Sequence, residues 1–305
     1  MPILEPNRDY RTPSLYSNQH SDTNLVHQDA IRHYDECYND YLFAWCNREN
    51  LALHYGYWDQ ETRSHHQALL NKNSILYQLG QISSTDCVLD AGCGIGGSSI
   101  WMAKHHQNQV TGITISQNQA IQATRHAQRQ GVENLVRFEI SDFCQTPFQD
   151  QHFDVIWGLE SICHAVNKGD FLQEAFRLLK PEGRLVVCDG FITRREFSDD
   201  EWQDIIICLD GWAVPNLCSR TEFQSLLQST GFTDIQFHDI TEQTRPSSDH
   251  MFRIAKRLKP IQTISQWLGL RSQAQTANFK VGLSQYRLFQ DNLVEYGIFT
   301  ASKPE

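Results

Sequence analysis

Residues 88–99, VLDAGCGIGGSS, place four glycines within six positions and one carboxylate just before them. Because the glycines lie between an apolar run and a helical pattern, they predict a tight strand-to-helix turn with backbone N–H groups open to a ligand. A nucleotide-like molecule fits such a turn. Asp90 precedes the first glycine by two positions, where it would repel a phosphate and favour a cationic group. The four glycines are Gly92, Gly94, Gly96 and Gly97.

The same glycines also fit the dinucleotide fingerprint GxGxxG, laid on Gly92, Gly94 and Gly97. A dinucleotide site of that type usually has a carboxylate roughly 20 residues further on, where it holds the ribose hydroxyls. The corresponding stretch here, VTGITIS at 110–116, contains no acid and no arginine for a 2′-phosphate. The sequence therefore disfavours a NAD-dependent oxidoreductase, which stays open as an alternative.

The elements that would position this turn follow an alternating pattern. From about residue 85 to 190, strand-like and helical segments alternate, which predicts a parallel sheet flanked by helices. The clearest predicted helix is 170–180, where apolar residues recur every three or four positions before KPEG. The predicted strands are 87–90, 109–114, 136–140, 153–158 and 184–190.

The segments on either side of this alternation complete the predicted organisation. Residues 28–50 form an aromatic-rich helical pattern that we interpret as a lid, and residues 241–280 show no regular pattern. We also expect helices at 198–210, 220–229 and 281–291, a strand at 234–240, and a last strand from Val294 that closes the sheet at its edge. The predicted division is a flexible lead at 1–27 and one domain at 28–305, with an N-terminal lid at 28–80 and a cap insertion at 241–280.

Composition restricts the protein class. The chain has 305 residues, 40% of them apolar, enough for one large α/β domain. Its apolar runs are far shorter than the roughly 20 residues of a membrane span, and its N-terminus has no targeting pattern, so we expect a cytoplasmic protein. The net charge of −10 argues against nucleic acid as a partner. Nine cysteines without any CxxC pair predict no metal site and no disulfide framework.

The run LDAGCGIGG resembles the cofactor loop of the class I S-adenosylmethionine-dependent methyltransferases, whose cofactor is a cation without phosphates. The resemblance implies a Rossmann-like, seven-stranded, mostly parallel sheet with helices on both faces. It assigns cofactor contacts to Asp90 and the loop glycines. GITISQNQ at 112–119 resembles the branch that includes sterol 24-C-methyltransferases, tocopherol methyltransferases and cyclopropane synthases. In that branch the implied cofactor residues beyond the loop are Tyr34, Thr114, Gln119, Asp142 and Phe143.

Two candidate catalytic residues follow the fourth predicted strand. The run LESICHAVNK resembles the matching segment of the sterol 24-C-methyltransferases, and it contains Glu160 and His164. Methylation of an olefin leaves a carbocation, which a carboxylate with aromatic neighbours can stabilise and deprotonate. We therefore expect Glu160 to act as the base and His164 to carry a proton or orient the substrate. The alternatives are a structural hydrogen bond from Glu160 to the lid and a satisfied, partly buried His164.

Aromatic residues are the candidates for the acceptor site. By the same resemblance Tyr57 and Trp58 would wall the acceptor, with simple lid packing as the alternative. Trp212, within the stretch LDGWAVPNLCSRTEF at 209–223, would border an apolar pocket. Further candidates for this pocket are Trp202, Pro215, Phe252 and Trp267.

Together these observations predict a methyltransferase that moves a methyl group from S-adenosylmethionine to a small lipophilic, isoprenoid-like acceptor. Carbon methylation is the first interpretation. The alternative is O- or N-methylation of a phenolic, quinol or amine metabolite, with Glu160 and His164 as deprotonating or binding groups. A non-catalytic cofactor-binding protein is a further alternative. The sequence is compatible with peripheral membrane contact and does not determine the oligomeric state.

Overall fold

Seven strands form one sheet in the order β3-β2-β1-β4-β5-β7-β6, in a computed structural model that describes residues 22–305. β1 through β5 pair in parallel, as predicted, and β7 runs antiparallel between β5 and β6. The predicted edge position of the last strand is therefore wrong, because β6 occupies that edge. The strands are β1 Cys87–Ala91, β2 Gln109–Thr114, β3 Val136–Ile140, β4 Phe153–Leu159, β5 Leu179–Ile192, β6 Thr233–Asp239 and β7 Val294–Ser302.

Successive residues of the central strands bury their side chains on opposite faces of the sheet. Val88 of β1 belongs to one buried cluster and Leu89 to another, and Val155 and Ile156 of β4 divide in the same way. Such continuous apolar runs are typical of parallel strands that are covered on both faces. One cluster includes side chains of α3 and α4, and the other includes side chains of α6 and α8.

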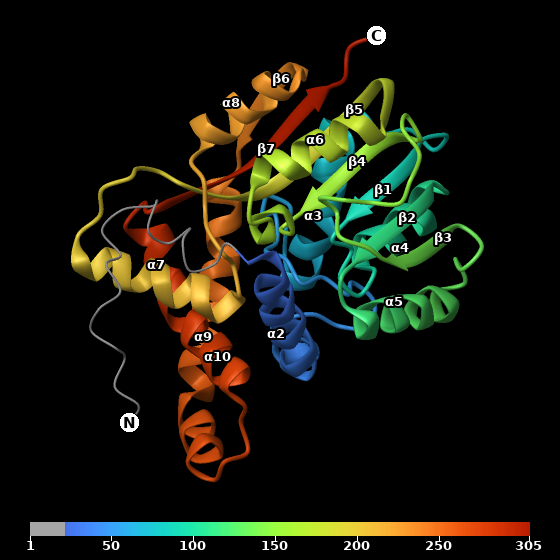
Figure 1. The fold of residues 1–305 in the computed structure, drawn as a ribbon. Helices are drawn as coiled ribbons and strands as arrows, with labels where there is room; N and C mark the ends of the chain where they lie inside the picture. Colours follow the sequence, from blue (N-terminus) through green and yellow to red (C-terminus); the bar gives the residue numbers. More distant parts are fainter. Residues whose placement is uncertain (1–21) are drawn as a thin grey trace.

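Helices cover both faces of the sheet (Figure 1). Many begin at a side-chain cap, as at Ser116 before α5 and in the capping box of Ser219 and Glu222 before α8. A Rossmann-like α/β fold, as predicted, is the result. The helices next to the sheet are α3 His65–Leu79, α4 Gly97–His106, α5 Gln117–Gln130, α6 Lys168–Leu178 and α8 Arg220–Thr230.

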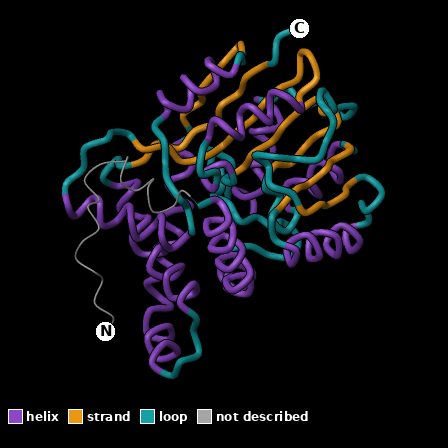
Figure 2. Tube along the Cα trace, viewed as in Figure 1, coloured by secondary structure: helices purple, strands orange, loops and turns teal. Residues whose placement is uncertain are grey.

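A second group of helices lies to one side of the sheet and includes a long hairpin (Figures 1 and 2). The helix α2 begins at Thr23, so the end of the predicted flexible lead at 1–27 is helical. The rest of that lead, 1–21, lies outside the described residues. Within 22–305, no helix is both long enough and apolar enough to cross a lipid bilayer. The group consists of α2 Thr23–Ala44, α7 Asp199–Trp212, α9 Thr241–Trp267 and α10 Gln273–Gln290.

The prediction for residues 241–280 is wrong, because α9 and α10 make this segment helical along most of its length. α9 has two internal prolines, Pro246 and Pro260, which ordinarily interrupt helices. Its buried face is also mostly polar, so the apolar periodicity that reveals a helix is weak. The predicted helix at 281–291 is the end of α10, which begins eight residues earlier at Gln273. The buried residues of α9 are Thr244, Ser247, Ser248, Ala255 and Gln262.

Candidate functional site

The glycine turn after β1 opens a cavity at the carboxyl ends of β1, β2 and β4. Gly92 has φ +84° and Gly94 has φ +54°, backbone conformations that favour glycine. A Cβ added to Gly92 would lie 2.4 Å from Cβ of Ser161, whose hydroxyl donates to the carbonyl of Ala91 at 2.5 Å. Gly96 is the left-handed N-cap of α4 and does not line the cavity. We call this space the glycine-loop cavity; its lining includes Asp90, Gly92, Gly94, Gly97, Thr114 and Gln119.

The polar groups of the glycine-loop cavity suit a cation. Asp90 is buried and accepts a hydrogen bond from the Ser99 hydroxyl at 2.6 Å. Burial raises the pKa of Asp90 to about 6. The described residues that line the cavity include the carboxylates of Asp90 and Glu160 but no lysine or arginine. A pyrophosphate would find no positive side chain here, whereas S-adenosylmethionine, which is positively charged and lacks phosphates, fits this donor set.

Of the five predicted cofactor residues beyond the glycine loop, four line the glycine-loop cavity and Asp142 does not. The Thr114 hydroxyl donates to Oε1 of Gln119 at 2.6 Å, and both residues line the cavity. Phe143 also lines it and packs edge-on against Phe171. Asp142 does not line the cavity, and its carboxylate accepts a hydrogen bond from the backbone N–H of Cys144 at 2.8 Å.

A second cavity, which we call the aromatic cavity, adjoins the first. It contains about 920 Å³ of unoccupied space, its mouth included. Leu209 of α7, Met251 of α9 and Leu288 of α10 add aliphatic surface. Both cavities share Tyr34, Leu53, His54, Glu160 and His164. The aromatic lining beyond Tyr34 is Tyr41, Trp45, Tyr55, Trp212, Phe289 and Tyr296.

Glu160 stands at the border of the two cavities. It directly follows β4, has a positive φ of +50°, and accepts a hydrogen bond from the backbone N–H of Tyr55 at 2.8 Å. Burial raises the pKa of Glu160 to about 8, although the nearby Lys72 opposes that shift. The predicted alternative, a hydrogen bond to the N-terminal segment, is thus present. This hydrogen bond engages Oε1 of the Glu160 carboxylate and not Oε2.

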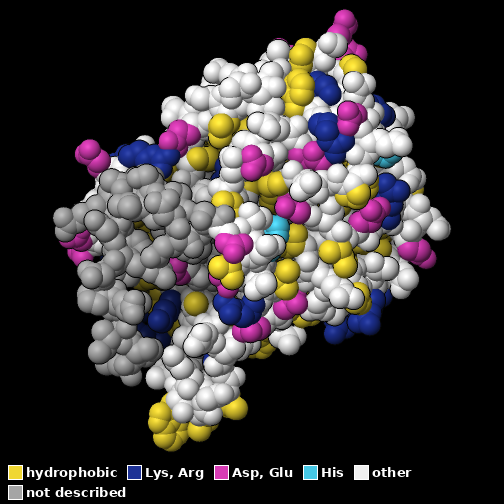
Figure 3. Space-filling view, viewed as in Figure 1, with side chains coloured by type: hydrophobic (Ala, Val, Ile, Leu, Met, Phe, Trp, Pro, Cys, Tyr) yellow, Lys and Arg dark blue, Asp and Glu magenta, His cyan; other side chains and the backbone are white. Residues whose placement is uncertain are grey.

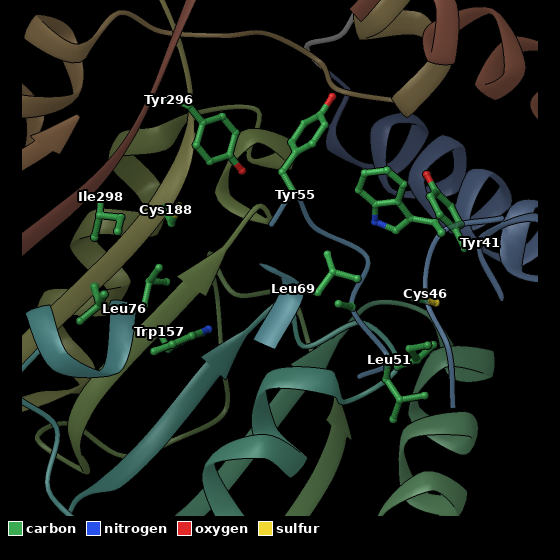
Figure 4. Close-up of a cluster of buried hydrophobic side chains, with 14 of the residues drawn as sticks. Tyr41, Cys46, Leu51, Tyr55, Leu69, Leu76, Trp157, Cys188, Tyr296 and Ile298 are labelled. Carbon is green, nitrogen blue, oxygen red and sulfur yellow. The ribbon is translucent and has the colours of Figure 1, made fainter. Parts of the chain in front are cut away.

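Lys72 and Tyr296 lie beside this carboxylate, although they belong to α3 and β7. The ammonium of Lys72 is fully buried, lies 4.4 Å from the centre of the Tyr296 ring, and donates to the Thr244 hydroxyl at 3.3 Å. Burial and the nearby Glu160 raise the pKa of Tyr296. Figure 4 shows the Tyr296 ring beside Tyr55, and the two rings meet edge to face at 5.9 Å. Sequence reasoning missed Lys72, Tyr55 and Tyr296, which no local motif connects.

His164 ends a short 3-10 helix, η1 Ile162–His164, on the same border. Its Nδ1 lies 3.2 Å from the carbonyl oxygen of Ala213, and its Nε2 lies 3.0 Å from the Tyr34 hydroxyl. Because a carbonyl can only accept, Nδ1 carries the proton and Nε2 accepts from Tyr34. Burial lowers the pKa of His164 to about 4, so the ring is neutral near pH 7.

Asp189, three residues before the end of β5, is a second acidic residue of the aromatic cavity that sequence reasoning missed. Its carboxylate accepts hydrogen bonds from the backbone N–H groups of Cys163 at 2.8 Å and Gly190 at 3.0 Å. Burial raises its pKa to about 6. The position of Asp189 just after an apolar strand run was the available signal, because parallel strands bring their carboxyl ends to one edge. Among residues 22–305, no cluster of three or more His, Cys, Asp or Glu side chains could hold a metal ion.

Only one of the three predicted acceptor residues lines the aromatic cavity. Trp212 lines it, whereas Tyr57 and Trp58 line neither cavity. Trp58 instead faces α9, where its indole N–H donates to the Ser247 hydroxyl at 2.9 Å. Tyr55, two residues before Tyr57, does line the aromatic cavity. The other predicted pocket residues, which also lie outside the aromatic cavity, are Trp202, Pro215, Phe252 and Trp267.

Comparison with known proteins agrees with this geometry. Residues 89–187 match the family described as "Methyltransferase domain". The 27-O-demethylrifamycin SV methyltransferase of Amycolatopsis mediterranei is 31% identical over 83% of this chain and 90% of that protein. The chloroplastic tocopherol O-methyltransferase of Arabidopsis thaliana is 26% identical over 88% and 81%, respectively. Geranyl diphosphate C-methyltransferase from Streptomyces coelicolor, solved with Mg2+, geranyl diphosphate and S-adenosyl-L-homocysteine, has a TM-score of 0.67 at 21% identity, covering 91% of this chain and 97% of that one.

Proposed function

Because this chain belongs to the class I S-adenosylmethionine-dependent methyltransferases, we propose that it methylates a small lipophilic, isoprenoid-like acceptor held in the aromatic cavity. The observation that carries the proposal is the place of Glu160, which lines the glycine-loop cavity and the aromatic cavity at once. A group at this border can act on an acceptor while the cofactor occupies the neighbouring space. The apolar and aromatic lining supports a lipophilic molecule.

Carbon methylation of an olefin is the reaction that this lining supports best. S-adenosylmethionine, when bound, supplies an electrophilic methyl group. The two π electrons of the acceptor form the new carbon–carbon bond, the electrons of the carbon–sulfur bond stay on sulfur, and a carbocation remains. The faces of nearby rings, Tyr55 and Tyr296 among them, can stabilise that cation. Loss of a proton from the adjacent carbon to Glu160 then restores a double bond.

The protonation state of Glu160 is suited to this role once a cation is present. Its pKa of about 8 keeps most of the Glu160 carboxyl groups protonated at pH 7 when no cation lies nearby. A positive charge in the shared cavity would favour the ionised form, which is the form that can accept a proton. The N–H of Tyr55 holds one carboxylate oxygen in place during this change.

A separate observation supports a second candidate function, O-methylation. The neutral His164 accepts the Tyr34 hydroxyl proton through Nε2 at the border of the cavities, so Tyr34 could take a proton from an acceptor hydroxyl while it passes its own proton to this ring. The resemblance to 27-O-demethylrifamycin SV methyltransferase and tocopherol O-methyltransferase supports this alternative. A hydroxyl acceptor would then need His164 more than Glu160.

Labelled-methyl transfer to a panel of prenyl diphosphates, sterols, quinols and amines tests the proposal. The acceptor is expected among the olefins, and Glu160→Gln should lower kcat by roughly 100-fold or more, as for loss of a general base. The matched control is Glu49→Gln, an exposed glutamate outside both cavities that should leave kcat unchanged. If Glu160→Gln keeps normal turnover while His164→Asn abolishes it on a hydroxylated acceptor, O-methylation is correct and the carbon assignment fails.

A further inference from the structure

The tip of the hairpin formed by α9 and α10 carries a concentrated apolar surface. The hairpin projects away from the sheet, and its tip shows hydrophobic side chains at the lower end of the space-filling view (Figures 1 and 3). Ile261, Ile264 and the C-cap residue Leu268 follow one another at helical spacing at the end of α9. The apolar tip consists of Ile261, Ile264, Trp267, Leu268 and Leu270, which are 62%, 58%, 84%, 55% and 70% exposed.

This concentration is unusual for the described part of the chain. Of the nine large hydrophobic residues exposed there, five belong to the apolar tip, and the other four are scattered along the sequence. Single exposed apolar residues are ordinary on protein surfaces, but a contiguous group marks a contact surface. Trp267 is the most exposed of them, and tryptophan is enriched where proteins meet the interface between lipid and water.

The charge of the hairpin indicates what the apolar tip contacts. Residues 250–290 contain seven lysines and arginines and no aspartate or glutamate, although the whole chain has a net charge of −10. The imbalance is not evident as a local motif because the basic residues do not form a run. Arg271 and Arg287 are paired with acids from other segments. Four exposed basic side chains of α9 form no ion pair with another described residue, namely Arg253, Lys256, Arg257 and Lys259.

We propose that the hairpin tip docks the protein on an anionic lipid surface. The apolar tip would enter the boundary between headgroups and acyl chains, while Lys256 and Lys259, which precede Ile261 on α9, contact acidic headgroups. Basic residues behind an apolar edge complement a negatively charged bilayer. The base of the same hairpin contributes Met251 and Leu288 to the aromatic cavity. Docking there would hold the aromatic cavity near lipophilic molecules dissolved in the bilayer. The docking proposal does not depend on which reaction the protein catalyses.

Vesicle flotation without any cofactor or acceptor tests this docking surface. Wild-type protein should float with phosphatidylcholine vesicles that contain phosphatidylglycerol and should bind pure phosphatidylcholine much less. The double variants Trp267→Ser with Leu270→Ser, and Lys256→Glu with Lys259→Glu, should each lower the partition coefficient roughly tenfold. Phe43→Ser is the matched control, because Phe43 is 82% exposed on α2 and lies outside the tip. It should bind like wild type.

Three outcomes would overturn the proposal. These are no flotation of the wild type, equal flotation of the tip variants, and sedimentation that shows a dimer for the wild type but a monomer for Trp267→Ser with Leu270→Ser. Raised salt should weaken the binding, since it screens headgroup charges. Thermal unfolding of each variant checks that the fold is intact. Because no methyl transfer is measured, this result is independent of the proposed reaction.

Discussion

The hydroxyl of Tyr34 lies 3.0 Å from Nε2 of His164 and joins residues that are 130 positions apart in the chain. Their rings also meet edge to face at 5.5 Å. Through this contact, α2 closes over the border of the glycine-loop cavity and the aromatic cavity, and it holds the neutral imidazole in one orientation. The segment for which the sequence predicts a lid is therefore joined to the site by a specific hydrogen bond.

Removal of the Tyr34 hydroxyl should destabilise the protein. Tyr34→Phe leaves Nε2 of His164 buried without its donor, so the free energy of unfolding should fall by about 1–2 kcal/mol. Urea unfolding at pH 7 measures the change. The control is Tyr286→Phe, because the Tyr286 ring stacks on Phe252 and its hydroxyl makes no hydrogen bond with a described residue. Equal stability of the two variants would show that the bond to His164 contributes nothing.

Substitution of Gly92 should damage the glycine turn. Gly92 and Gly131 both have positive φ, but an added Cβ would meet Ser161 at 2.4 Å only in the first case and nothing within 4 Å in the second. Gly131→Ala should therefore cost only about 1 kcal/mol of backbone strain. Gly92→Ala should cost more and should also weaken the binding of S-adenosylhomocysteine. Urea unfolding and calorimetry compare the two, and similar affinity in both variants would contradict a ligand contact at this turn.

Stability should depend on pH through Glu160. The unfolded group ionises near pH 4.5 and the folded group near pH 8, so its contribution to stability is complete below pH 4.5 and is lost as pH rises through 8. Relative to wild type, Glu160→Gln should gain about 2 kcal/mol in unfolding free energy between pH 6.5 and 8. The buried histidines titrate alike in both proteins and cancel in this difference. A difference that does not change with pH would show that Glu160 is already ionised in the folded state.

Binding of a cation should release a proton from the same group. Near pH 7, roughly nine in ten Glu160 carboxyls are protonated when no cation lies nearby, whereas Asp90, with a pKa of about 6, is mostly ionised. S-adenosylmethionine carries one more positive charge than S-adenosylhomocysteine, so it should release more protons on binding. Calorimetry in buffers of different ionisation enthalpy counts them. The excess should disappear in Glu160→Gln, and its persistence there would assign the proton to another residue.

Local patterns predicted the parallel part of the sheet and the cofactor turn. The strand from Cys87 and the glycines after it depend on short-range properties, namely continuous apolar runs and backbone freedom at the turn. The helix α9 escaped prediction because its buried side chains are small and polar and two prolines interrupt its pattern. Tertiary contacts with α10 and β7 support it instead.

The sequence by itself determined an α/β fold with a site that favours a cationic ligand, because a turn and its adjacent carboxylate are encoded within a dozen residues. The resemblance of that run to the class I methyltransferases implied the cofactor and the reaction. Only the tertiary structure decided which side chains surround the acceptor space. Tyr55, Lys72, Asp189 and Tyr296 come from four separate segments. No sequence spacing connects them, because only strand order and helix packing bring them close to the Glu160 carboxylate.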